Sequence, residues 1–320
     1  MNLPNYIPEL LPDQTLYSWT AMFHYLTGAA SASETCRTLF GAATAGRHFH
    51  IPTHLDYLSA QTQSVLGSVE EIVATSTIIP FYTQFRPSRI AREVLAKVRG
   101  TQNAGLIQTL GIYKIGKQSL PLQRACIECI QEDQEKYGYR YWHVAHQLPC
   151  TLVCHKHGTM LIGVRTSHVK DRRSPFATPR VPQIALAQDV SKRIRTNEHD
   201  QLDRLAQIAK NMLVHRQTGG WNRDRLKQVF LTEIKDRNVW YAEQMLDPHK
   251  LELDFFQHFR DLVEVIELAP AIQQRGIYSV WCLIEGVERI VHPEDWVIAI
   301  EWIFGSWERF MNKYQSLPTP

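Results

Sequence analysis

Cys126-Ile-Glu-Cys129 and Cys154-His-Lys-His157 are two short metal-binding hooks separated by 24 residues. Each hook, Cys-x2-Cys and Cys-x2-His, turns the backbone so that two side chains can point at one ion. A second hook at this separation arises by chance far less often than a lone Cys-x2-Cys. The sequence therefore predicts one structural Zn2+ ion, bound by Cys126, Cys129, Cys154 and His157.

The fourth ligand has a competitor in Cys150, because Cys150-x3-Cys154 also has a spacing that zinc sites use. His157 is preferred because His155 is directly adjacent to Cys154, and Cys150 also fits a small buried apolar residue. Four protein ligands leave no position for water, so the predicted ion stabilises the fold and performs no chemistry.

The composition is that of a water-soluble globular protein. The chain has 320 residues, 44% of them hydrophobic and 21% charged, which is enough for two or three domains with a real core. It shows neither a secretory signal nor a transmembrane run. Six cysteines, four of them crowded around the hooks, fit a reducing compartment better than a disulfide scaffold. We therefore expect a cytoplasmic protein that does not use a membrane.

The charge is unevenly distributed. The net charge of +3 does not by itself indicate nucleic-acid binding. Residues 1–180 hold 18 Lys+Arg against 12 Asp+Glu, whereas the remainder holds 17 against 20. Any surface that faces phosphates is therefore expected in the N-terminal and zinc-binding regions.

Hydrophobic spacing of three and four residues predicts a mainly α fold. We predict five consecutive parts: a helix-turn-helix domain (1–65), a helical connector (66–120), a small β-containing zinc-finger module of the zinc-ribbon type (121–165), a basic linker (166–195) and a C-terminal helical domain (196–320). Three short helices in the first part suit a helix-turn-helix, although any three-helix bundle has the same pattern.

Local signals place several helix ends. The first helix is expected to open at Pro12-Asp13 and to stop at Gly28. Two further helices are expected to start at the capping boxes Ser31-Ala-Ser-Glu34 and Ser68-Val-Glu-Glu71. Further expectations are a third helix from Ile51, a short helix over 132–137, an extended stretch over 140–149, a β element over 160–164, and a final helix from Pro293 through Trp307.

Candidates for nucleic-acid contact come from two regions. Arg47, His48 and His54 surround the predicted third helix, and Arg172 and Arg173 lie in the basic linker. Each of these residues also fits an ordinary solvated surface position.

Signatures of enzymes are missing from the sequence. It contains no phosphate-binding loop, dinucleotide fingerprint, His-Glu-x2-His, Gly-x-Ser-x-Gly or kinase motif. His143 and His146 lie close to the hooks, so a zinc-dependent hydrolase that borrows one of them is the alternative of a different class. We expect a protein without catalytic activity.

An ordered set of motifs resembles the TniQ/TnsD family, the target-selection proteins of bacterial transposons. The set covers about the first 160 residues and comprises Leu11-Pro-Asp-Gln-Thr-Leu-Tyr-Ser-Trp19, Leu39-Phe-Gly41, Ile51-Pro-Thr-His-Leu55, Ile78-Ile-Pro-Phe-Tyr82, the two hooks, Tyr137-Gly138, Trp142, His146-Gln-Leu-Pro149 and Gly158. The C-terminal half matches loosely, through Ile277-Tyr-Ser-Val-Trp281. Cys150 departs from the pattern, which has glycine or a similarly small residue after Leu-Pro.

The resemblance implies a non-catalytic adaptor of the bacterial cytoplasm, with a helix-turn-helix, a structural zinc finger and a helical C-terminal part. Such an adaptor recruits the AAA+ ATPase TnsC, which brings in the transposase. TniQ-like members attach, often as a homodimer, to an RNA-guided Cascade complex, whereas TnsD-like members bind attachment-site DNA directly. A chain of 320 residues favours the adaptor branch or a shortened TnsD-like protein.

Overall fold

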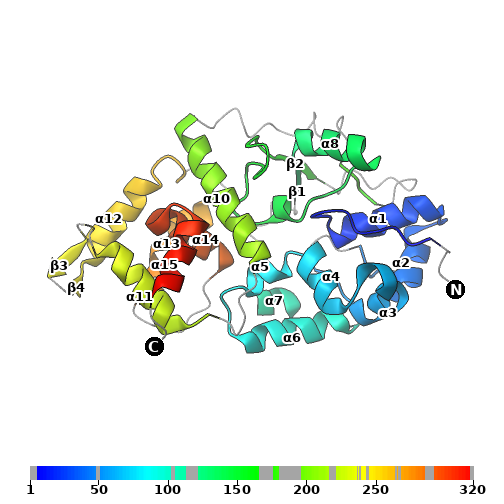
Figure 1. Ribbon diagram of the computed structural model, residues 1–320, viewed down its shortest axis with the longest axis horizontal. Coiled ribbons are helices and arrows are strands. Elements are labelled where there is room, and N and C mark those ends of the chain that lie inside the picture. The colour runs from blue at the N-terminus through cyan, green and yellow to red at the C-terminus, as the bar shows by residue number, and fades with distance from the viewer. Residues whose placement is uncertain are drawn as a thin grey trace. The chain divides into compact units, whose positions relative to one another are not determined.

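The computed structural model describes residues 6–47, 51–101, 105–112, 122–165, 176–179, 196–215, 221–235, 237, 239–242, 245–263, 265, 268–284 and 292–317. These residues are mainly helical, with two small antiparallel sheets of two strands each (Figure 1). The predicted mainly α fold is confirmed. None of the helices in the described ranges has the length and apolar character needed to cross a membrane.

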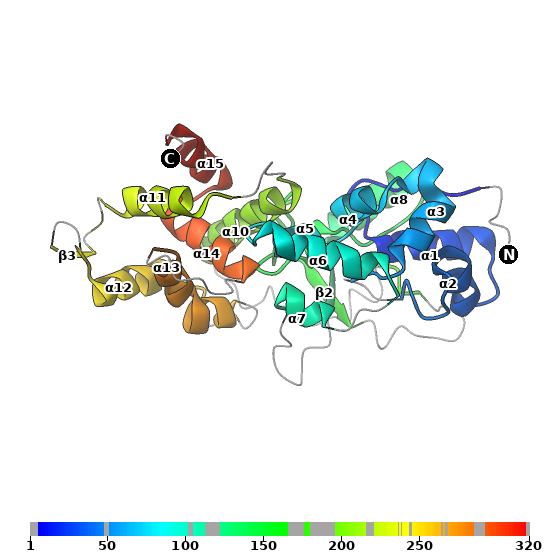
Figure 2. The same ribbon diagram turned by 90° about the horizontal axis from the view of Figure 1, so that it is seen from below.

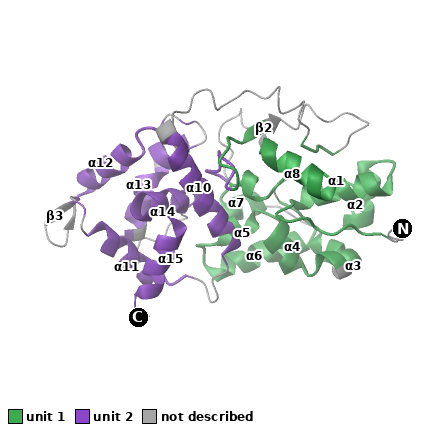
Figure 3. Ribbon diagram, turned by 45° about the horizontal axis from the view of Figure 1, so that its top comes forward, with its two compact units in different colours: residues 1–148, 156–192 green, residues 149–155, 193–320 purple. Residues whose placement is uncertain are grey.

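The chain divides into two compact units (Figure 3). Unit 1 comprises residues 1–148 and 156–192, and unit 2 comprises residues 149–155 and 193–320. The boundaries of the five predicted parts stay predictions.

Unit 1 is a set of short helices with one β-ribbon. Its elements are α1 (Leu16–Thr27), α2 (Ala32–Phe40), α3 (Leu55–Leu66), α4 (Val69–Ser76), α5 (Ile79–Thr83), α6 (Ser88–Arg99), α7 (Leu106–Leu110), β1 (Leu122–Ala125), α8 (Ile127–Tyr137), the 3-10 turn η1 (Ala145–Gln147) and β2 (Ile162–Arg165). Helix α3 packs against α2, α4 and α6, and α6 also packs against α7 (Figures 1 and 2). Strands β1 and β2 pair antiparallel, with Leu122 opposite Arg165.

Helix ends follow the capping signals of the sequence in most places. Gly28 ends α1 with a left-handed φ of 62°, as expected. The reciprocal capping box of Ser68 and Glu71 at α4 is confirmed. At α2 only half of the box forms, because the Glu34 carboxylate accepts the N–H of Ala30, at 2.9 Å, instead of that of Ser31.

Two helices start later than expected. Helix α1 begins at Leu16 behind the N-cap Thr15, because Asp13 has a left-handed φ of 58° and cannot belong to a helix. Helix α3 begins at Leu55, because His54 has a φ of 63°. The predictions of helix starts at Pro12 and Ile51 were therefore wrong by a few residues.

The metal-binding region also differs in detail. Helix α8 starts at Ile127, directly after Cys126, and not at residue 132. The stretch expected to be extended over 140–149 contains η1. The expected β element is confirmed as β2, shifted to Ile162–Arg165.

The core of unit 1 joins the N-terminal helices to the metal-binding region. It contains Tyr17, Ala21, Ala32, Cys36, Ala125, Ile130, Trp142 and Phe176. Tyr25 Oη donates to the Phe176 carbonyl, and Trp142 Nε1 to the Ala177 carbonyl, both at 2.8 Å. Residues 176–179 of the predicted basic linker therefore pack into this core. The other residues of the linker lie outside the described ranges.

Unit 2 is a helical bundle. Its elements are α10 (Thr196–Val214), α11 (Arg223–Ile234), β3 (Trp240–Ala242), β4 (Met245–Leu246), α12 (Pro248–His258), the π-helical turn η4 (Pro270–Arg275), α13 (Gly276–Ile284), α14 (Pro293–Phe304) and α15 (Trp307–Ser316). Helix α14 is buried along its length and packs against α10, α13 and α15. Gly305, at a φ of 72°, ends α14, so Trp307 starts a separate helix and the predicted single final helix was wrong.

A buried carboxylate joins three helices of unit 2. Glu301 of α14 is 1% exposed. Its carboxylate accepts from Arg204 Nε of α10 at 3.0 Å, lies 2.6 Å from His258 Nε2 of α12, and accepts from Gln201 Nε2 at 3.2 Å. These partners compensate a charge that would otherwise be costly to bury.

Candidate metal centre

The two hooks lie at the ends of structured elements that face each other. Cys126 is the N-cap residue of α8 and Cys129 lies in its first turn. Cys154 and His157 belong to the turn that precedes β2. The ligand atoms of these four residues all lie within 4.8 Å of one another, and the three cysteines are buried. The structure thus brings together the set of residues that the spacing predicts.

The spacing of the ligand atoms fits a tetrahedral zinc ion. The sulfur atoms of Cys126 and Cys129 each lie 3.4 Å from His157 Nδ1. Zinc–sulfur and zinc–nitrogen bonds of ordinary length, at the tetrahedral angle, give a sulfur–nitrogen separation of about 3.6 Å. The cluster could therefore hold a metal ion through three sulfurs and one nitrogen. Such an ion would tie α8 to the turn before β2.

Cys150 does not join this cluster among the described residues. It is buried at 4% exposure and has a φ of +63°. A left-handed backbone favours glycine, because other residues pay for the clash of Cβ with the backbone. This conformation gives a physical reason why the TniQ/TnsD pattern has glycine after Leu-Pro. His157, and not Cys150, is the fourth member of the cluster that could hold a metal ion.

A second group of potential ligands lies beside the cluster. His146, Cys154 and His155 also have ligand atoms within 4.8 Å of one another. His146 Nε2 is 3.9 Å from Cys129 Sγ. Burial and, secondarily, the charge of His143 lower the pKa of His146 to about 3, so its imidazole is neutral. His146 was expected only as a borrowed catalytic residue, and the structure places it next to the metal-binding sulfurs.

Neighbouring polar side chains contact two of the four candidate metal ligands, His157 and Cys126. His157 Nε2 lies 3.1 Å from Glu132 Oε1, which leaves Nδ1 facing the sulfurs, and Glu132 also pairs with Lys156. A carboxylate behind a ligating histidine fixes the ring and raises its basicity. The Thr159 hydroxyl lies 3.2 Å from Cys126 Sγ. Sequence reasoning missed Glu132, although its place one helical turn after Cys129 was a usable signal.

His143 is held by two carboxylates. Its Nε2 is 2.8 Å from Asp133 Oδ2, and its Nδ1 is 3.5 Å from Asp13 Oδ2. Tyr141 stacks on the imidazole with 4.5 Å between ring centroids. Burial alone would lower the pKa of His143, but the hydrogen bonds and charges of Asp13 and Asp133 outweigh it and raise the pKa to about 9. At neutral pH this ring is an imidazolium, which cannot bind a metal.

This bridge attaches the segment before α1 to the metal-binding region. The Asp13 carboxylate also accepts a hydrogen bond from the N–H of Ala145, at 3.2 Å. The backbone carbonyl of Asp13 accepts one from the N–H of Val144, at 2.7 Å. Tyr141 Oη donates to the Pro12 carbonyl at 3.0 Å. Because Asp133 lies one turn after Cys129 on α8, the metal cluster and the bridge share one helix.

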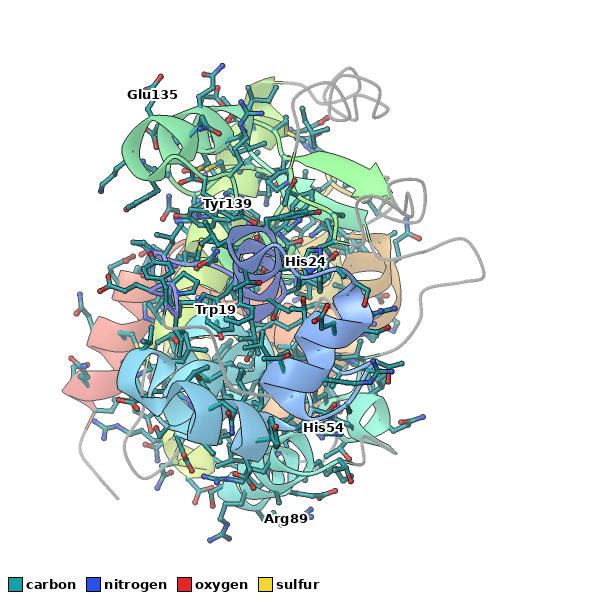
Figure 4. The ribbon with its side chains drawn as sticks, turned by 90° about the vertical axis from the view of Figure 1, so that its right-hand side faces the viewer. Trp19, His24, His54, Arg89, Glu135 and Tyr139 are labelled. Atoms are coloured by element: carbon teal, nitrogen blue, oxygen red, sulfur yellow. The ribbon has the colours of Figure 1, made fainter. Side chains whose placement is uncertain are left out.

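The predicted nucleic-acid contacts are distributed as follows. Arg47 Nη2 donates to Ser33 Oγ at 2.8 Å. His54 is the N-cap residue of α3 (Figure 4). Its N–H donates to the Gly100 carbonyl at 2.9 Å, and its ring nitrogen lies 3.0 Å from Thr53 Oγ1. His48, Arg172 and Arg173 lie outside the described residues. Both described candidates thus have a structural role.

Comparison with known proteins gives two findings. Residues 5–161 match the TniQ family, a range that contains all four cluster residues, α1 to α8 and η1. The chain is also similar to the transposon Tn7 transposition protein TnsD of Escherichia coli, with 18% identity over 348 aligned positions that cover 97% of this chain and 68% of that protein.

Proposed function

We propose that this chain, whose residues 5–161 match the TniQ family and which is similar to the transposition protein TnsD, selects target sites for a bacterial transposon without catalysing a reaction itself. The observation that carries this proposal is the TniQ match over residues 5–161. The matched range contains the N-terminal helices, the Cys/His cluster and the Asp13–His143–Asp133 bridge. One hydrophobic core joins α1 and α2 to α8, through Tyr17, Cys36 and Ile130.

The proposed role of the metal is structural. A zinc ion at Cys126, Cys129, Cys154 and His157 would supply folding free energy and fix α8 against the turn before β2. This fixes Asp133, and through His143 the segment before α1. The metal then shapes the surface of the N-terminal helices without contacting a partner.

We propose that the protein links recognition of the target to a TnsC-type AAA+ ATPase, and through it to the transposase. Two modes of recognition are open: attachment to an RNA-guided Cascade complex, or direct binding of attachment-site DNA. The similarity to TnsD extends over 97% of the chain, which makes direct binding of attachment-site DNA the second candidate.

The hydrolase alternative has less support from the site. The His143 ring is occupied by two carboxylates, and His146 is 1% exposed, so neither ring is placed to activate a water molecule that reaches the metal from solvent. Four Cys/His side chains around one ion also leave no open position for substrate.

A reconstituted transposition reaction tests the proposal. Transposase, TnsC-type ATPase and donor DNA are combined with and without this protein, and insertion sites are mapped by sequencing. We expect insertions to concentrate at one site or one guided region only when the protein is present. Adding and omitting Cascade with its guide RNA separates the two modes of recognition. Insertion patterns that do not depend on the protein under either condition would refute the proposal.

A further inference from the structure

Helix α6 carries most of the basic residues of the N-terminal helices, and α3 carries none. The α3 sequence, Leu55–Leu66, contains no lysine or arginine and has one acid, Asp56. Helix α6, Ser88–Arg99, contains four basic residues and one acid. A nucleic-acid surface needs cations that can reach phosphates, so α6 suits that role better than α3 does.

The basic residues of α6 fall into two groups. Those near its C-terminus are neutralised within the fold: Lys97 pairs with Glu93 at 2.9 Å, and Arg99 pairs with Asp56 at 2.7 Å and with Glu70 at 2.5 Å. Arg89 and Arg92 are exposed. Within the described part of the chain neither forms a salt bridge, although the charge of Arg89 acts on Glu93, one helical turn later. Figure 4 shows Arg89 at the periphery of unit 1.

These two arginines share one face with a small residue. The buried stripe of α6 consists of Ile90, Val94 and Val98. Arg89, Arg92 and Ala96 are exposed and recur at intervals of three and four residues on the opposite side, and we name them the α6 face. The small Ala96 side chain lets another molecule approach the helix closely.

The position of the charges is unfavourable for α6 itself. Arg89 and Arg92 lie in the first half of the helix, and no acidic residue is present in its first turn. Cations are disfavoured near a helix N-terminus because they repel its positive dipole end. Within α6 the charge of Arg89 is attracted only weakly by the exposed Glu93, one turn later, whereas a polyanion bound from outside would be attracted by both arginines.

We propose that the α6 face contacts the phosphate backbone of duplex DNA, with Arg89 and Arg92 each neutralising one phosphate. This rests on the proposed function, in which the target is DNA. B-form DNA has a major groove wide enough to admit a helix, whereas the major groove of an RNA duplex is too narrow. Phosphate contacts position the protein on the duplex and add affinity that does not depend on sequence.

Fluorescence anisotropy with the full chain tests this proposal, using labelled 30-base-pair DNA of mixed sequence at 50–200 mM salt. Each phosphate contact contributes a slope of about 0.9 in log K against log salt. Arg89→Gln with Arg92→Gln should therefore make the slope shallower by about 1.8 and weaken binding on the order of 50-fold at 0.1 M salt. Arg89→Lys with Arg92→Lys should retain most of the affinity, because lysine also neutralises phosphate as a point charge.

The matched control is Arg37→Gln with Lys136→Gln, which removes two exposed cations of unit 1 from α2 and α8. It should leave the salt slope within about 0.5 of the wild type, and all variants should unfold at the wild-type temperature. An equal loss in the control, no salt-dependent binding by the wild type, or tighter arginine-dependent binding to an RNA duplex of the same sequence would each overturn the proposal. Target selection is measured separately, in the transposition reaction. The proposed DNA contact of Arg89 and Arg92 can therefore fail while the proposed function holds, and the reverse.

Discussion

The buried Asp13–His143–Asp133 bridge predicts that unit 1 loses stability when the pH rises above neutrality. The pKa of His143 is raised from 6.5 to about 9 in the folded protein, so the folded state holds a proton that the unfolded chain releases earlier. The stabilisation is complete below pH 6.5, decreases between pH 6.5 and 9, and is gone above pH 9. Tyr141 and the neutral His146 also face the ring and keep their charge state through most of this range.

The magnitude follows from the two pKa values. Each pKa unit corresponds to about 1.4 kcal/mol, so a rise from 6.5 to about 9 contributes roughly 3 kcal/mol to the stability of unit 1 at pH 6. This is a large part of the free energy of unfolding of a typical folded domain, which is roughly 5–15 kcal/mol. His143→Gln removes the charge and with it the pH dependence.

Urea unfolding followed by hydrogen exchange measures the effect locally. Peptides that cover residues 11–20 and 139–148 report the segment before α1 and the η1 region, which the bridge connects. We expect the free energy of unfolding of unit 1 to be roughly 3 kcal/mol higher in the wild type than in His143→Gln at pH 6. At pH 9.5 the two free energies should be equal within error. Taking the difference between wild type and His143→Gln at each pH cancels the contribution of the cluster thiols, which titrate in both proteins. His249→Gln, which removes an exposed histidine of α12, serves as the matched control.

The carboxylates can be tested one at a time. Asp133→Asn should lower the pH midpoint of the His143 proton signal in NMR, because it removes one of the two charges that raise the pKa. Glu135→Gln, which changes an exposed acid on the same helix, should leave that midpoint in place. If the difference in unfolding free energy between wild type and His143→Gln stayed constant from pH 6 to 9.5, or grew with pH, the proposed role of the Asp13–His143–Asp133 bridge would be refuted.

Three further substitutions test other parts of the structure. Cys150→Gly should retain one zinc per chain and unfold within about 1 kcal/mol of the wild type, because the gain from a relaxed φ offsets the lost side chain; loss of zinc would make Cys150 a ligand. Cys126→Ser should release the metal and abolish cooperative unfolding of unit 1, since structural zinc supplies on the order of 10 kcal/mol, and unchanged thermal stability would contradict this. Glu301→Ala should destabilise unit 2 by about 1–3 kcal/mol in urea, because the buried Gln201 amide loses an acceptor while the partly exposed Arg204 and His258 stay solvated; the exposed Glu252→Ala should have little effect.

Local features of this fold could be predicted from the sequence. Gly28 at the end of α1 and the Ser68–Glu71 box at α4 act through residues within one helical turn, so the sequence shows them directly. The Cys/His cluster was also predictable, because each pair of ligands is close in sequence and the spacing determines how the backbone turns.

Features that depend on distant residues could not be predicted in this way. Asp13 meets His143 across 130 positions, and this contact explains why Asp13 leaves the helical conformation and α1 starts only at Leu16. The shared core of α1, α2 and the metal-binding region likewise arises from packing between distant segments, although the sequence suggests separate parts. The arginines of α6 were visible in the sequence, but their exposure, and the absence of a salt bridge to either Arg89 or Arg92 among the described residues, required the structure.

Zinc K-edge X-ray absorption on the purified protein tests the central claim most directly, namely that a closed structural metal site organises a target-selection protein. The predicted result is one zinc per chain with three sulfur ligands at about 2.3 Å and one nitrogen at about 2.0–2.1 Å. The spectrum should be the same for the wild type and for Cys150→Gly. An oxygen ligand from exchangeable water, four sulfur ligands, or a folded protein without bound metal would contradict the account.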